Sequence, residues 1–372
     1  MFNLLKKNLI NIPGKSIKKK LIVIESDDWG GIRMPSKAVF NKLQAQKLSP
    51  ENDPYLKFDS LATSQDMQAL YDILKSVKDK NNNPAIITAN TVMGNPDFEK
   101  IKLSNFQNYY WESFKSTWKR YPNCNGTEDL WKQGQENKLL RFQCHGREHL
   151  NVDRWIKDLK NNKILRKAFD LEMISISSQP SALRFGYMES LDYFSENEKK
   201  KKKKIVEEGL MEFNKYFGFS SKSYIANCYI WDDFIEQILK SNGVNFIQGI
   251  SNQIKPVLKN NLHYHAYKRN FFGKKNKYGQ MYLVRNAFFE PSLKPEIDWV
   301  SECLNRIKIA FRWGKPAIIG CHRLNFIGAI HEENRKKNLV LFKSLLNQIV
   351  KKWPNVEFVS SDRIFDKLIS DE

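Results

Sequence analysis

The chain has 372 residues, of which 41% are hydrophobic and 24 are phenylalanine, enough for one folded domain with a large core. Its 61 Lys and Arg against 41 Asp and Glu give a formal net charge of +20. No apolar run approaches the roughly 20 residues that span a membrane, and residues 1–20 lack the apolar core of a secretory signal. These features exclude a membrane-spanning protein, and we expect a cytoplasmic one.

The positive charge is spread along the chain. Its one dense run, residues 199–204, is typical of a solvated loop or helix start. No interleaving of aromatic and basic residues accompanies this run, so we expect no nucleic acid to bind. Residues 1–19 form a basic arm that also carries leucine, isoleucine and phenylalanine, a composition that allows peripheral contact with the inner face of a membrane. The five cysteines are odd in number and scattered, which is typical of reduced thiols.

Short apolar runs rich in Ile and Val predict the strands. They occupy residues 21–26, 85–89, 139–144, 171–177, 223–229, 244–248, 281–285, 316–321 and 356–360. Helical patterns lie between several of them, at 66–78, 153–160, 232–241, 299–313 and 336–352. Alternation of strands and helices predicts an α/β protein with a parallel sheet, most simply a closed or nearly closed barrel. We expect residues 20–372 to form this single domain.

Two stretches exceed a minimal repeat of strand and helix. Residues 97–138 are rich in aromatic side chains, and residues 178–220 are charged and helical in pattern. Because the first insertion enters between Asn90 and His145, we expect it to overhang the site and to form part of a substrate groove. The alternative is that its aromatic residues only anchor the insertion.

Polar residues follow several of the predicted strands. Asp27 and Asp28 follow the first strand, and His145 and His322 follow two later ones. In barrels of parallel strands the carboxyl ends of the strands form one rim, where active sites are built. We therefore expect these side chains to meet, with Asn90 on the same rim.

His145 and His149 have the spacing that lets two imidazoles bind one metal ion. The same residues also spell His-x-x-Glu-His, a peptidase motif that requires both histidines inside one helix. His145 instead follows a strand-like run, which favours a strand end that leads into a helix. Two histidines held by ordinary hydrogen bonds are a further alternative.

Asp27 and Asp28 are neighbours, and neighbouring side chains on a regular strand point to opposite faces. A turn of the backbone at the strand end would let one carboxylate bind a metal while the other lies beside the attacking water. The alternative is an Asp-Asp pair that caps a helix or turn. His322 has the residue type of a general acid that works near neutral pH.

These motifs in this order resemble the polysaccharide deacetylases of carbohydrate esterase family 4, the NodB-homology proteins. They look more like a divergent bacterial subgroup of polysaccharide deacetylase-like proteins than like the family at large. This likeness is carried by Ile-Glu-Ser-Asp-Asp-Trp-Gly at 24–30, by Phe-Gln-Cys-His-Gly-Arg-Glu-His-Leu-Asn-Val at 142–152 and by Cys-His-Arg-Leu-Asn-Phe at 321–326. The resemblance extends from residue 20 to about residue 365.

The resemblance implies a distorted (β/α) barrel of about seven parallel strands with one divalent metal ion, usually zinc. Transferred motif by motif, it makes Asp28, His145 and His149 the metal ligands. Asp27 becomes the base that activates water, and His322 the acid that protonates the leaving amine.

The resemblance also places Asp298 and Trp299 at the Asp-Trp motif of the family. Asp298 would then orient the catalytic histidine, a role for which Glu290 is a rival, and Trp299 would wall the acetyl pocket. The Arg-Pro-Pro-Tyr motif of the family should align with residues 224–231, which lack both the arginine and the prolines. Arg285, Arg147 or Arg33 would have to replace that arginine. The residues expected to bind substrate are Trp29, Asn90, Arg147, Tyr229, Trp231, Arg285, Trp299, Arg323 and Asn325.

The sequence thus predicts a metal-dependent hydrolase that removes N-acetyl groups from an amino sugar in a polysaccharide or its precursor. A cytoplasmic location favours a lipid-linked or nucleotide-linked precursor. Two alternatives stay open: a glycoside-bond hydrolase or lyase that uses the same rim, and an inert carbohydrate-binding relative.

Overall fold

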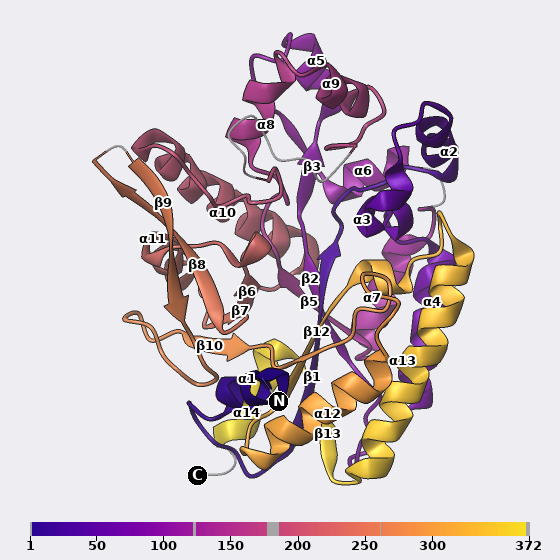
Figure 1. The fold of residues 1–372 in the computed structure, drawn as a ribbon, viewed down its shortest axis with the longest axis vertical. Coiled ribbons are helices and arrows are strands. Elements are labelled where there is room, and N and C mark those ends of the chain that lie inside the picture. The colour runs from indigo at the N-terminus through magenta and orange to yellow at the C-terminus, as the bar shows by residue number, and fades with distance from the viewer. Residues whose placement is uncertain (1, 122–123, 177–185, 261, 370–372) are drawn as a thin grey trace.

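The computed structural model describes residues 2–121, 124–176, 186–260 and 262–369, which form a curved parallel sheet surrounded by helices (Figure 1). The order of the strands along the sheet is β10-β7-β6-β5-β2-β1-β12-β11, and β13 also pairs with β1. These strands are β1 (Lys20–Trp29), β2 (Ile87–Thr91), β5 (Leu140–Cys144), β6 (Ser223–Ile225), β7 (Phe246–Gly249), β10 (Met281–Val284), β11 (Ala287–Phe288), β12 (Ala317–His322) and β13 (Val356–Phe358).

The two ends of the sheet are close in sequence. Only Arg285 and Asn286 separate β10 from β11, which are the first and last strands in the order. Because so short a connection cannot cross a wide gap, the sheet curls into a distorted barrel. Neighbouring strands of this sheet pair in parallel. The predicted α/β barrel is confirmed, with eight strands along the path where about seven were expected.

Strand β1 separates two apolar layers because successive side chains on a strand point to opposite faces. Leu21 and Val23 belong to a buried cluster with residues of β7, β10 and β12, which lies inside the barrel. Ile24 belongs to the larger cluster between the sheet and its helices. The same alternation points Glu25 and Asp27 into the barrel above its apolar interior.

The helices cover the outside of the barrel (Figure 1). They are α1 (Phe2–Asn11), α2 (Lys37–Ala45), α3 (Pro54–Phe58), α4 (Ser64–Ser76), α5 (Phe98–Leu103), α6 (Phe114–Arg120), α7 (Thr127–Glu136), α8 (Val152–Leu159), α9 (Lys163–Phe169), α10 (Glu196–Phe217), α11 (Asp233–Ser241), α12 (Trp299–Arg312), α13 (Glu332–Lys352) and α14 (Ile364–Ile369). Helices α4, α12 and α13 pack along one side, and α10 packs against α11 on the other. Helix α4 begins with a capping box, in which Thr63 and Asp66 bind each other's backbone N–H groups.

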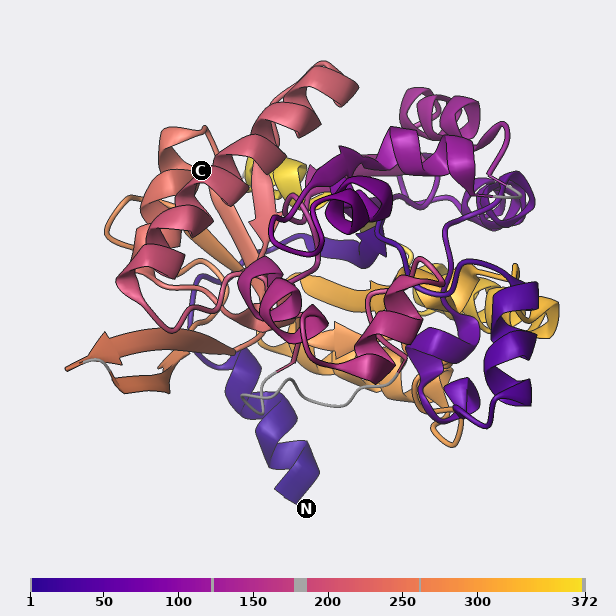
Figure 2. The ribbon, with the colours of Figure 1, turned by 90° about the horizontal axis from the view of Figure 1, so that it is seen from above.

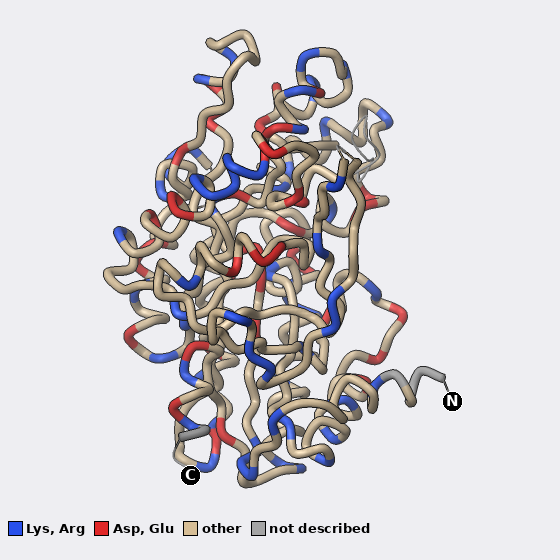
Figure 3. Tube along the Cα trace, turned by 90° about the vertical axis from the view of Figure 1, so that its left-hand side faces the viewer, with Lys and Arg blue, Asp and Glu red and all other residues tan. Residues whose placement is uncertain are grey.

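Helix α1 stands out from the body in the view from above (Figure 2). Its base packs against α12, where Lys7 forms a 2.6 Å ion pair with Glu302. Basic and acidic residues are interspersed over the whole trace (Figure 3), which agrees with the spread expected from the sequence. None of the helices in the described ranges combines the length and hydrophobicity needed to cross a membrane.

The predicted strand at 171–177 is wrong for its described part, and residue 177 lies outside the described residues. Glu172 takes a left-handed φ of +55°, which interrupts an extended chain. Met173 and Ile176 are nevertheless buried in a satellite cluster beside α2. The apolar residues of this segment therefore indicate burial correctly, but they do not form a strand.

The sequence analysis missed an antiparallel hairpin formed by β8 (Asn252–Lys259) and β9 (Leu262–Arg269). It also missed the short antiparallel pair of β3 (Gly94–Pro96) and β4 (Trp111–Ser113). The expected insertion at 97–138 contains α5, β4, α6 and α7, and the described part of the one at 178–220 contains α10. All five cysteines are free.

Candidate metal centre

The end of β1 carries Asp27 and Asp28 on an irregular stretch of strand. The pairing of β1 with β2 shifts register between Ser26 and Trp29, and Asp28 has a left-handed φ of +73°. A bulge of this kind re-aims side chains, and here both carboxylates line the same cavity. Left-handed geometry is costly for a residue with a Cβ, so surrounding structure must hold it in place.

His145 and His149 bring their ring nitrogens to Asp28. Nε2 of His145 lies 3.4 Å, and Nε2 of His149 3.5 Å, from Asp28 Oδ1. Donor atoms of the three residues lie within 4.8 Å of one another. Ligands about 2.1 Å from a tetrahedral zinc ion are about 3.4 Å apart, so these separations suit a shared ion. Asp28 Oδ1 is buried without a hydrogen-bond partner among the described residues, as expected of an atom whose partner is a cation.

The ring of His145 is oriented by the backbone. Its Nδ1–H donates to the carbonyl of Ile225 at 2.9 Å, which leaves the lone pair on Nε2 for a metal. The amide of Asn227 lies 3.3 Å from this Nε2, a weak contact that a bound ion would replace. The three residues thus fit the ligand set Asp, His, His predicted from the sequence.

The two histidines lie on a strand end and the loop after it. The backbone N–H of His145 still donates to Thr91 in the sheet, and Gly146 then turns the chain with a φ of +104°. Helix α8 begins only at Val152, after the cap Asn151. This geometry contradicts the peptidase motif, which needs both histidines inside one helix.

The charges around the triad favour metal-binding protonation states. Burial favours the neutral acid at Asp28, but His149 and Arg33 outweigh it and hold the pKa of Asp28 well below its usual value. Arg33 donates to the other carboxylate oxygen, Oδ2, at 3.2 Å. Burial is the main cause that lowers the pKa of His149 to about 3, so this imidazole is neutral and can act as a ligand.

Arg285 holds Asp27 from inside the barrel. Its Nη1 and Nη2 donate to the two oxygens of Asp27, each at 2.7 Å, and its Nε donates to Glu25 at 2.7 Å. Asn90 adds a third bond to Asp27 at 2.8 Å. Burial alone would raise the pKa of Asp27, but the attraction of Arg285 outweighs burial and lowers the pKa to about 2. Of the three arginines that the sequence analysis offered, Arg285 is the one paired with Asp27.

His322 is paired with Glu290. Its Nδ1 lies 2.7 Å from Glu290 Oε1, and Asn325 donates to Glu290 Oε2 at 2.8 Å. Burial favours the neutral imidazole, but the carboxylate of Glu290 outweighs it and raises the pKa of His322 to about 9. A histidine with this pKa carries a proton at neutral pH and can donate it.

Asp298 does not orient His322. It is exposed and caps α12 by accepting a hydrogen bond from the backbone N–H of Ser301. Trp299 is half-buried beside it and donates to the carbonyl of Lys294. An Asp before an apolar run is an ordinary helix cap, and here this local role prevails.

The triad, Asp27 and His322 line one cavity of about 400 Å³. Two residues of its wall, Cys228 and Tyr229, take left-handed φ values of +54° and +58°, a strain that is typical of functional sites. The hydroxyl of Tyr229 accepts a 3.2 Å hydrogen bond from Arg285. The other wall residues are Arg33, Asp53, Tyr55, Leu56, Ser175, Met188, Ile225 and Ala226.

Several residues predicted to bind substrate lie elsewhere. Trp29 is buried against Trp131, and Trp231 donates to Glu236 of α11. Three more do not line the cavity: Arg147, which pairs with Glu148 and Glu208, Arg323, which donates to Asp59 and Gly31, and Trp299. Asn90 donates a hydrogen bond to Asp27, and Asn325 donates one to Glu290, so each contacts a residue of the site and not the cavity itself. The sequence analysis missed Glu25 and Tyr55; period-2 alternation with Asp27 could have indicated Glu25.

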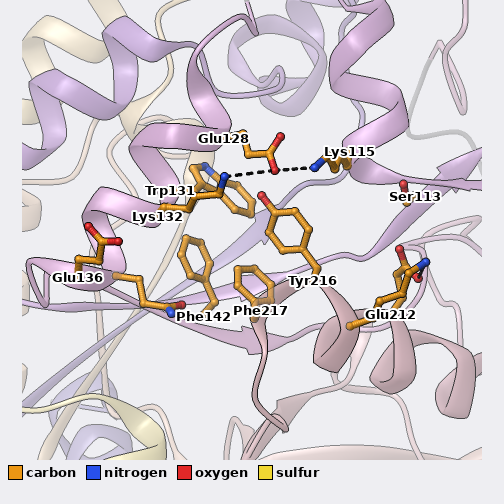
Figure 4. Close-up of a pocket in the computed structure, with 12 residues that line it drawn as sticks. Ser113, Lys115, Glu128, Trp131, Lys132, Glu136, Phe142, Glu212, Tyr216 and Phe217 are labelled. Carbon is orange, nitrogen blue, oxygen red and sulfur yellow. Dashed lines mark hydrogen bonds and ion pairs between the residues drawn. The ribbon is translucent and has the colours of Figure 1, made fainter.

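The aromatic insertion lines a different cavity, of about 530 Å³, which Figure 4 shows. Trp131 stacks on Phe142 of β5 with ring centroids 4.6 Å apart, and Phe142 stacks on Phe217 of α10 at 4.6 Å. No residue of 97–138 in the described ranges lines the cavity of the triad. The aromatic contacts therefore favour anchoring of the insertion.

No family model and no curated protein matches this sequence. Among solved structures, a "probable polysaccharide deacetylase" from Pseudomonas aeruginosa PAO1 has 9% identity and a TM-score of 0.45, over 94% of this chain and 90% of that one. PuuE allantoinase has 10% identity and a TM-score of 0.45, over 94% and 89%. A 4-alpha-glucanotransferase from Thermococcus litoralis has 8% identity and a TM-score of 0.44. The match covers 94% of this chain but only 40% of that enzyme. Similarity at this level does not define a reaction, which must be argued from the residues.

Proposed function

We propose that this protein is a metal-dependent hydrolase that removes N-acetyl groups from an amino sugar. The observation that carries the proposal is the meeting of three kinds of group in one cavity: the triad of Asp28, His145 and His149, the ionised carboxylate of Asp27, and the imidazole of His322. A metal ligand set, a base and an acid are the groups that amide hydrolysis requires.

Asp28, His145 and His149 would hold a divalent ion, which would supply Lewis acidity toward a carbonyl and toward water. Asp27, with a pKa of about 2, stays ionised at any physiological pH but has low proton affinity. Its role would therefore be to orient the attacking water and to accept its proton. Arg285 fixes both oxygens of Asp27 and so sets its direction toward the cavity.

His322 supplies the second proton transfer. With Glu290 beside it, the imidazole stays protonated up to a pH of about 9 and can donate Nε2–H to the nitrogen that leaves when the amide bond breaks. The side chain is 23% exposed on the cavity wall, so it can reach a bound substrate. Tyr55 packs edge-on against His322, with ring centroids 5.6 Å apart, and limits its rotation.

The acetylated amino sugar is favoured by the resemblance of the three motifs to polysaccharide deacetylases. A cavity of about 400 Å³ falls within the range of small-molecule sites, about 300–1,000 Å³. We place the sugar on a lipid-linked or nucleotide-linked precursor, since the net charge of +20 attracts a phosphate-bearing carrier.

The test is release of acetate by zinc-loaded protein from UDP-N-acetylglucosamine and from an N-acetylglucosamine pentamer, with Asp27→Asn protein as the control. Acetate from either sugar, absent with the control, supports the proposal. Shortened oligomers without acetate would indicate a glycoside-bond hydrolase or lyase. A wild-type protein that binds no metal would indicate an inert relative.

We also propose that α1 contacts an anionic membrane from the cytoplasmic side. Leu5 and Leu9 of the helix and Ile12, just after its end, are exposed. Arg269 donates to the carbonyl of Leu9, which brings a positive charge beside this apolar face. Apolar side chains flanked by basic ones suit the interface of an anionic bilayer.

A further inference from the structure

A second group of metal-ligand residues lies outside the cavity already described. Asp192, His263 and His265 place donor atoms within 4.8 Å of one another. Nε2 of His263 lies 3.0 Å from Asp192 Oδ1, and Nε2 of His265 lies 3.2 Å from Asp192 Oδ2. The two histidines are two residues apart on β9, so both side chains leave the same face of the strand.

The group is enclosed but can be reached from solvent. The side chain of Asp192 is fully buried, that of His263 is 6% exposed and that of His265 is 19% exposed. The ring of Phe194 covers His263, with centroids 4.1 Å apart. An ion could therefore approach past His265 and then be shielded from water.

The charges around Asp192 do not exclude a cation. Arg154 donates to Asp192 Oδ2, but a second carboxylate, that of Glu189, lies 2.6 Å from the same guanidinium and offsets its charge. The backbone N–H of Tyr193 donates to Oδ1 at 3.0 Å. A carboxylate offers about four lone-pair positions, so two remain, and they face the two histidines.

We propose that Asp192, His263 and His265 bind a second divalent ion, Zn²⁺, at a structural site. Donors of a tetrahedral zinc site lie about 3.4 Å apart, and each imidazole here lies close to that separation from one carboxylate oxygen, His263 at 3.0 Å from Oδ1 and His265 at 3.2 Å from Oδ2. Two imidazoles and a carboxylate are donors that zinc accepts readily. The ion would tie the hairpin of β8 and β9 to the segment 186–194.

This segment also reaches the first site. Met188 lines the cavity of the triad, and the hydroxyl of Ser190 donates to Asn227, whose amide contacts the carbonyl of His145 at 3.2 Å. The side chain of Asn151, two residues after His149, donates to the carbonyl of Asp192 at 2.9 Å. An ion at the second site would hold the wall and ligands of the first, but its binding does not depend on the proposed reaction.

The experiment measures bound zinc in full-length protein that has been stripped with a chelator, dialysed against ZnCl₂ and separated from free ions. The variants are His263→Ala, His265→Gln, His145→Ala and the double variant His145→Ala/His263→Ala. His331→Ala is the matched control, because His331 packs between Phe40 and Phe58 outside both groups. Asp192 is left intact, since its removal would strand the charge of Arg154.

We expect two zinc ions per chain in wild type and in the control, one in each single variant and none in the double variant. Zinc should also raise the melting temperature of His145→Ala protein but not that of the double variant. One ion in wild type with no loss in His263→Ala and His265→Gln would overturn the proposal and leave a hydrogen-bonded network. If the first site were wrongly assigned, His145→Ala would keep all its zinc while His263→Ala lost one ion, so the two failures are distinguishable.

Discussion

Substitution Glu290→Gln tests the role of His322 because it removes the charge that keeps this imidazole protonated and nearly preserves shape. The pKa of His322 is raised from 6.5 to about 9, a difference of about 3 kcal/mol at 1.36 kcal/mol per unit. Without the Glu290 carboxylate, burial, which lowers the pKa of a histidine, is opposed only by the smaller attractions of Asp28 and Asp27. We therefore expect the pKa to fall to about 6.5.

The expected effect depends on pH. A pKa of 9 leaves about 90% of His322 protonated at pH 8, whereas a pKa of 6.5 leaves about 3%. Turnover of Glu290→Gln protein should thus be about 30-fold below wild type at pH 8 and nearly equal at pH 6. A bound divalent ion lowers both pKa values and preserves their order. Titration of the His322 ring by NMR and the pH profile of acetate release both measure the shift.

The control is Glu357→Gln, which removes a buried carboxylate paired with Lys80 and Lys367 away from the cavity. It should leave the profile unchanged. An unchanged alkaline limb in Glu290→Gln protein, together with an unchanged pKa of His322, would refute the assignment of His322 as the acid.

Three further results are expected. Asp27→Asn and His322→Ala should each cut turnover roughly 100-fold to 10,000-fold while zinc content stays at the wild-type value, because each removes a proton transfer but no ligand; full activity in Asp27→Asn protein would contradict this. Arg285→Met leaves the buried carboxylates of Glu25 and Asp27 without their partner and should lower the free energy of unfolding in urea by about 3–5 kcal/mol. Arg306→Met removes a partly exposed ion pair with Glu302 and should lower it by under about 1 kcal/mol. Equal losses in the two variants would contradict this expectation. Leu9→Glu should reduce the amount of protein that sediments with vesicles containing phosphatidylserine, and should leave the amount that sediments with neutral vesicles unchanged. Unchanged binding to the phosphatidylserine vesicles would exclude α1 as the contact.

The sequence predicts much of this site because the ends of the buried strands can be recognised in it. Apolar runs located β1, β5 and β12, and the rule that parallel strands share a rim brought Asp28, His145 and His322 to one cavity. The left-handed backbone at Asp28, which lets both carboxylates face that cavity, is not predicted by the sequence, because aspartate tolerates this conformation better than most residues but still adopts it rarely.

Long-range partners were harder to predict. Arg285 is 258 residues from Asp27 in the chain. It lies between β10 and β11, the two end strands of the sheet, and it reaches Asp27 because the sheet curls into a barrel. The place of Asp298 in a motif favours it over Glu290 as the partner of His322, whereas in the structure Asp298 caps a helix. A pKa of about 2 also keeps Asp27 ionised far below neutral pH, which its residue type alone does not indicate. Such shifts follow from burial and partners, which sequence does not display.

The central claim is that Asp28, His145 and His149 hold one catalytic divalent ion. Anomalous X-ray scattering at the zinc edge, measured on crystals of the zinc-loaded protein, locates the ion directly. A shared ion should give a peak about 2.0–2.2 Å from Asp28 Oδ1, His145 Nε2 and His149 Nε2, which disappears in His145→Ala crystals. A wild-type map without a peak between these three atoms, under conditions in which the protein releases acetate, would contradict it.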